Sequence, residues 1–213
     1  KSGNSSTNVL CLNGVAGNYA SAPDSAALSI TSDIDVRVWA ALNDWTPAAN
    51  TILLSKWEGA ASNNRSYALR VVATTGVFAF VVSVDGAASV TATSTVAPTV
   101  TDFSALWIRV TRSAASGDVI FYTSQDGSVW TQLGTTVSTA SGSIYDGNAS
   151  LLLGGINPSL PSEIPSGLIY RAKIYNGIAG TLVFDANFST ASKLATSFTE
   201  SSSNAATVTI NTS

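Results

Sequence analysis

The sequence contains no histidine, no methionine and a single cysteine, Cys11, among its 213 residues. Without histidine, neither a Ser-His or Cys-His nucleophile nor a histidine-ligated metal site can form. One cysteine excludes an internal disulfide bond and a thiolate zinc cluster. The lack of methionine predicts that the numbered chain begins inside a longer or processed product.

Charge is also scarce. Charged residues make up 11% of the chain, about half the usual share for a globular protein. The formal net charge is −3, so no basic stripe is available and we expect no nucleic-acid partner. No apolar run has the length of a membrane span, so we expect no membrane partner either. Hydrophobic residues reach 45%, which indicates a folded chain.

Alternation of apolar and polar residues with a period of two dominates the sequence. Residues 33–42 place one set of apolar side chains on one face and aspartate, arginine and tryptophan on the other, as in a half-buried strand. Val77–Val84 and Asp118–Thr123 are richer in apolar residues and are predicted to be covered on both faces. Further strands are predicted at residues 8–12, 18–22, 51–57, 67–72, 88–94, 106–110, 150–154, 168–175, 181–188 and 206–211.

Many short strands separated by turns predict an all-β fold, an antiparallel two-sheet β-sandwich. The hairpin signals are Asp85-Gly86, Asp126-Gly127 and Asp146-Gly147. We expect a polar linker at residues 1–7 and one domain at residues 8–213, since no interior boundary is visible. Residues 190–197 could form one helical turn. The proline-rich segment 157–165 is predicted to be a surface loop.

Two segments resemble a known superfamily. Residues 12–39 read LNGVAGNYASAPDSAALSITSDIDVRVW and resemble the opening of laminin-G-like domains, in the concanavalin A-like jelly-roll superfamily. Residues 169–176 read IYRAKIYN and are similar to that family's late strand, where Tyr170 and Arg171 replace two acidic residues. The resemblance implies a jelly roll over about residues 8–188.

Five further segments resemble laminin-G-like modules in minor tail proteins of phages that infect actinobacteria. They are DWTP at residues 44–47, LSKW at residues 54–57, NRSY at residues 64–67, DFSALW at residues 102–107 and FYTSQDGSVWTQL at residues 121–133. This resemblance implies a part of the phage particle surface or tail, or otherwise an extracellular protein. Its partners would be a host cell-surface glycan or other virion proteins, and assembly could make it oligomeric.

Aromatic residues near turns are the main candidates for ligand binding, because flat rings stack on the apolar faces of sugars. Four are predicted to lie on turns or loops and to form a rim surface: Trp45, Trp57, Trp130 and Tyr145. The alternative is that each ring fastens its own loop to the sandwich. Trp39 and Trp107 lie inside predicted strands and are expected to be structural.

Acidic residues suggest two further possibilities. Asp33 and Asp35 share a strand face, so they could serve as a hydrolytic pair or bind a cation, or could be solvated charges beside Arg37. Glu58, Glu163 and Glu200 lie far from any glucanase-like acidic motif. Related laminin-G domains often hold one calcium ion at a rim, which implies a possible calcium site at three loop residues: Asp126, Asp146 and Asn148. The alternative is simple hairpin turns, and no other cofactor is expected.

Three functions follow. The first is a non-enzymatic, virion-associated binding module that recognises host-surface carbohydrate or a neighbouring virion protein. The second is a purely structural decoration or tail-assembly protein with only protein–protein contacts. The third is a polysaccharide hydrolase or lyase, because jelly rolls host both activities. Cys11, in an alternating first strand, is expected to be a small buried apolar residue.

Overall fold

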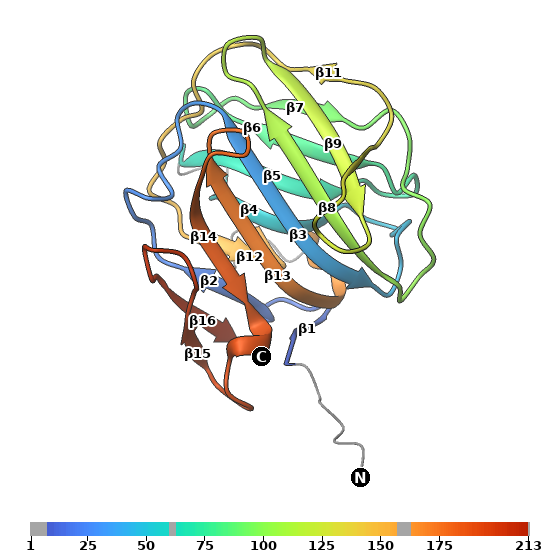
Figure 1. Cartoon of the computed structure of the whole chain (residues 1–213), viewed down its shortest axis with the longest axis vertical. Coiled ribbons are helices and arrows are strands. Elements are labelled where there is room, and N and C mark those ends of the chain that lie inside the picture. The colour runs from blue at the N-terminus through green and yellow to red at the C-terminus, as the bar shows by residue number, and fades with distance from the viewer. Residues whose placement is uncertain (1–7, 60–62, 157–162, 213) are drawn as a thin grey trace.

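The computed structural model describes residues 8–59, 63–156 and 163–212. It consists of two eight-stranded antiparallel sheets stacked face to face (Figure 1), which confirms the predicted all-β sandwich. Sheet A contains, in order, β1 (Leu10–Asn13), β13 (Ser166–Asn176), β3 (Ile34–Leu42), β8 (Ala105–Arg112), β9 (Asp118–Ser124) and β10 (Thr131–Gln132), with β14 (Thr181–Asn187) beside β13 and β11 (Val137–Ser138) beside β9. Sheet B contains, in order, β15 (Ser197–Thr199), β16 (Thr207–Asn211), β2 (Tyr19–Ala22), β12 (Leu151–Leu153), β4 (Thr51–Trp57), β5 (Arg65–Val71), β6 (Phe78–Val82) and β7 (Val90–Thr93).

The core lies between the sheets and follows the alternation of the strands. In β3, Ile34, Val36 and Val38 are fully buried in the central cluster, as predicted. All five residues of β6 are buried, which confirms a strand covered on both faces. The same prediction is wrong for β9, whose residues alternate between buried and partly exposed. Val119 and Phe121 enter the central core, whereas Asp118, Ile120 and Tyr122 are partly exposed, so only one face of β9 is covered.

Several local expectations differ from the structure. Residues 191–197 form no helix, and a single 3₁₀ turn, η2 (Phe188–Thr190), precedes them. Cys11 is exposed rather than buried, because Leu10 and Leu12 take the inward positions of β1. The expected linker 1–7 and most of the expected proline-rich loop lie outside the described residues. Within those residues, no helix is both long and apolar enough to cross a membrane.

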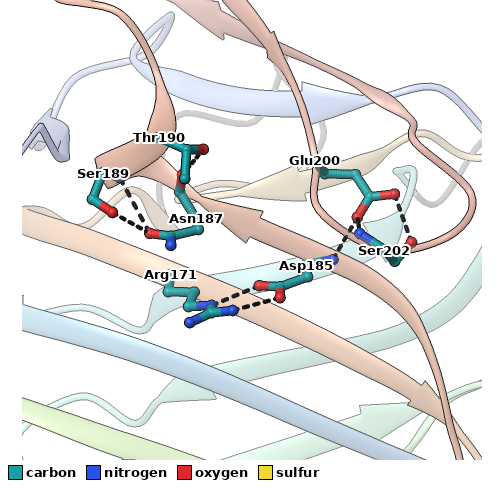
Figure 2. Close-up of polar contacts among 7 residues, drawn as sticks. All are labelled: Arg171, Asp185, Asn187, Ser189, Thr190, Glu200 and Ser202. Carbon is teal, nitrogen blue, oxygen red and sulfur yellow. Dashed lines mark hydrogen bonds and ion pairs between the residues drawn. The ribbon is translucent and has the colours of Figure 1, made fainter.

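A buried polar network attaches the C-terminal hairpin of β15 and β16 to sheet A (Figure 2). Arg171 on β13 donates two hydrogen bonds of 2.6 Å to the Asp185 carboxylate on β14. The Asp185 amide donates to the Glu200 carboxylate at 2.8 Å, and the Ser202 amide donates to it at 2.6 Å. Glu200 is 3% exposed, and backbone donors satisfy it, so its role is structural.

Candidate functional site

A groove lies on the outer face of sheet B, over strands β4 to β7. Its volume is about 310 Å³. The floor is a cross-strand row in which Ala68, Val81 and Thr91 lie directly opposite one another. Ala68 and Val81 belong to a small apolar cluster separate from the central core, so this face points away from sheet A. We call this hollow the sheet B groove.

The groove exists because small residues alternate with large ones along the strands. In β5, Tyr67 and Leu69 enter the central core, and Ala68 between them faces outward. Its methyl group leaves space above the sheet, which a larger side chain would fill. Thr91 on the edge strand β7 is exposed and places a hydroxyl group at the side of this space.

One end of the groove is formed by Trp57 and Arg65. The two residues pair across β4 and β5, and the guanidinium carbon of Arg65 lies 5.7 Å from the centroid of the Trp57 ring. The Nη1 group of Arg65 also donates to the Ala87 carbonyl. Trp57 is 8% exposed, so its ring is held in place by its neighbours. Trp57 is therefore the one predicted ligand-binding aromatic that lines this groove.

The other end contains a basic and an acidic side chain that are both poorly satisfied. Arg70 pairs with Ile52 across the sheet, and its Nε atom is buried without a hydrogen-bond partner in the described part of the chain. The Oε2 atom of Glu163 is likewise buried without one. Burial raises the pKa of the Glu163 carboxyl, and the charge of Arg70 partly offsets this shift.

Trp45 and Tyr145, two of the three other predicted ligand-binding aromatics, do not line the sheet B groove. Trp45 is 3% exposed, packs edge-on against Phe78 at 6.3 Å, and donates from its indole nitrogen to the Ser104 carbonyl at 3.3 Å. It fastens its loop to the core, as the alternative interpretation holds. Tyr145 is 37% exposed, and its ring lies so close to Gly86 that a Cβ atom there would meet it at 2.7 Å.

Trp130 joins a row of rings across the outer face of sheet A. Trp130 meets Trp107 edge-on at 6.3 Å, Trp107 stacks on Trp39 at 5.7 Å, and Trp39 lies 4.4 Å from Tyr170. The planes of Trp39 and Trp107 differ by 7°, so the two rings are nearly parallel and each covers part of one face of the other. The register of β3 and β8 aligns Trp39 with Trp107, and this pairing between distant residues leaves no local signal in the sequence.

The two candidate catalytic aspartates have different surroundings. Asp35 is fully buried and accepts hydrogen bonds of 2.8 Å from both Arg37 and Arg109. Asp33 precedes β3 and accepts from the Ala114 amide at 2.7 Å. They therefore do not form a carboxylate pair. In the alternative interpretation, the two aspartates are solvated charges beside Arg37. Asp35 does pair with Arg37, but it is not solvated, because Arg109 on β8 also covers it.

The residues of the expected calcium site are not brought together. The Asp126 carboxylate accepts the amides of Ser128 at 2.8 Å and Val129 at 2.9 Å, and these bonds lower its pKa. Asp126 follows β9, near the strand end where β8 begins. Asp146 and Asn148 lie on the connection to β12, which reaches the opposite end of sheet A. In the described ranges, no group of three or more cysteine, aspartate or glutamate residues could hold a metal ion.

Comparison with known proteins identifies the fold. No family model matches the sequence, and no curated protein matches it. Among solved structures, the chain is similar to domains LG4-5 of the mouse laminin α1 chain, with a TM-score of 0.57, 9% identity, and coverage of 81% of this chain and 42% of that one. It is similar to a Bacteroides ovatus protein assigned to carbohydrate binding, with a TM-score of 0.62, 10% identity, and coverage of 94% and 58%.

A third similar structure is the CBM40 module of the Ruminococcus gnavus IT-sialidase, with a TM-score of 0.59 and 13% identity. The match covers 81% of this chain and 92% of that module. The chain thus spans less than two thirds of the first two structures and nearly all of the third. These similarities show the fold, a two-sheet jelly-roll sandwich, which is the fold class that the sequence predicted.

Proposed function

We propose that this chain is a non-enzymatic carbohydrate-binding module and that the sheet B groove is its ligand site. The observation that carries the proposal is the composition of this cavity of about 310 Å³, a size at the lower end for ligand pockets. Trp57 and Val81 offer apolar surface to a sugar ring, and Thr91 and Arg70 offer hydrogen-bonding groups. The fold shared with carbohydrate-binding structures supports the proposal.

We further propose that the module is displayed on a phage particle and recognises carbohydrate of the host surface or a neighbouring virion protein. This context rests on the sequence motifs that resemble phage tail proteins. A small groove gives modest affinity at a single site, and many copies on one particle would multiply it by avidity.

A purely structural role in virion assembly is the second candidate. The row of rings on sheet A favours it, since tryptophan, tyrosine and arginine are enriched at the centres of protein interfaces. In that case contacts would form through sheet A, and the sheet B groove would bind no glycan. The hydrolase alternative gains no support from Asp33 and Asp35, because their carboxylates have different partners.

The test is a glycan array probed with a multimerised form of the chain, followed by variants. Thr91→Trp places a large ring over the groove from an exposed position on an edge strand. Thr207→Trp is the matched control, because Thr207 is also exposed and lies on β16, at the other side of sheet B. We expect binding by the native chain, loss of at least about tenfold in Thr91→Trp, and no loss in the control. If the multimer binds no glycan, the structural role is favoured.

A further inference from the structure

We infer that the ligand of the sheet B groove carries an anionic group, a carboxylate or a sulfate on a sugar ring, held by Arg70 at one end of the groove. The inference rests on the proposed function and specifies the chemical class of the ligand. It starts from the hydrogen bonding of the arginines.

Arg70 differs from the arginines on the outer face of sheet A. Arg37 and Arg109 each bind the Asp35 carboxylate through Nε and Nη2, and Arg171 binds Asp185 in the same way. The Arg70 side chain makes no hydrogen bond among the described residues, although its Nε atom is buried. A buried donor without a partner is costly, and two oxygens of a carboxylate or a sulfate can accept two parallel bonds from the Nε and Nη groups of a guanidinium.

The charge balance of the groove favours an anion over a cation. Arg65 and Arg70 contribute two positive charges to its lining, and Glu163 is the acidic residue that faces them. No ion pair joins Glu163 to either arginine within the described ranges. Burial disfavours the charged form of Glu163 and so weakens its competition with an incoming anion. The groove is therefore basic in a chain whose net charge is −3.

The spacing along β5 fits more than one sugar unit. Arg65 and Arg70 are five residues apart on an extended strand, so their Cα atoms are separated by about 16–17 Å. The floor residue Ala68 lies between them, and Trp57 lies at the Arg65 end. An acidic sugar bound by Arg70 would extend its apolar face over Ala68 and Val81, and a second ring could reach Trp57.

The experiment compares matched ligands on the native chain. Titration calorimetry is performed with trigalacturonic acid and its methyl ester, and with a sulfated galactose oligosaccharide and its desulfated form. We expect at least one charged member to bind about tenfold or more tightly than its neutral partner, as for a charge-assisted hydrogen-bond pair. The two pairs distinguish a carboxylate from a sulfate as the preferred group.

Variants then assign the effect to Arg70. Arg70→Gln should lose about tenfold or more of the affinity for the charged ligand and should keep the affinity for the neutral one. Lys193→Gln, the control, removes one exposed positive charge outside the groove and should bind as the native chain does. Equal binding of charged and neutral members, with Thr91→Trp still abolishing it, refutes the inference and leaves the proposed function standing. Binding of no glycan at all refutes the proposed function itself.

Discussion

Replacing Asp35 with alanine should be among the most damaging single changes on the outer face of sheet A. The fully buried carboxylate accepts hydrogen bonds from Arg37 and Arg109, with shortest distances of 2.8 Å, and from the Ala179 amide at 3.2 Å. Its removal leaves two guanidinium groups facing each other, with only 15% and 13% of the two arginine side chains exposed. Water can therefore solvate them only in part.

The expected cost follows from that geometry. Breaking a buried ion pair by removing one partner typically costs about 3–5 kcal/mol of unfolding free energy. For a chain of this length, each kcal/mol lowers the melting temperature by about 2–4 °C, so a shift of about 6–20 °C is expected. Asp118→Ala is the matched control, because Asp118 is only partly buried and its carboxylate accepts one hydroxyl bond, from Ser138. Its loss should cost about 1 kcal/mol.

Urea unfolding followed by tryptophan fluorescence measures both variants. Trp39 and Trp107 lie in the strands that carry the network, so their emission reports on this sheet. If Asp35→Ala destabilises the chain no more than Asp118→Ala does, the guanidinium groups must be solvated in solution, and the argument from burial fails.

The remaining predictions concern a turn, a thiol and a carboxyl. Gly127→Ala should cost at least about 1–2 kcal/mol in urea unfolding, because Gly127 has φ of +73° and a Cβ atom would lie 2.8 Å from the ring of Trp107; an unchanged midpoint would contradict this. Cys11 is exposed and should react fully with a thiol reagent in the folded chain, whereas a requirement for denaturant would show that it is buried. Because burial raises the pKa of Glu163, its negative charge is lost at a higher pH than in an exposed glutamate. Calorimetry should therefore show affinity for a sulfated sugar rising as the pH falls through this pKa, and Glu163→Gln should abolish that dependence; an identical pH profile would refute it.

The strand pattern was largely readable in the sequence, and the groove was not. Thr51–Trp57 was predicted with its observed bounds, because a run of apolar residues between turn signals is a local signal. The strands that were missed, β10, β11 and β15, have two or three residues, too few for alternation to be visible. Trp57 was predicted to bind a ligand, but Arg70 was not. The sequence around a single arginine in a strand does not show whether its side chain has a hydrogen-bond partner in the folded chain.

Period-two alternation and Asp-Gly turns determined by themselves that this chain is an antiparallel sandwich, since side-chain direction in a strand depends only on neighbouring positions. Which residues meet across strands was decided by the tertiary structure. The pairing of β5 with β6 and of β6 with β7 aligned Ala68, Val81 and Thr91 into one hollow. Register depends on contacts between residues far apart in the chain, so a ligand site on a sheet face emerges only when the sheet is complete.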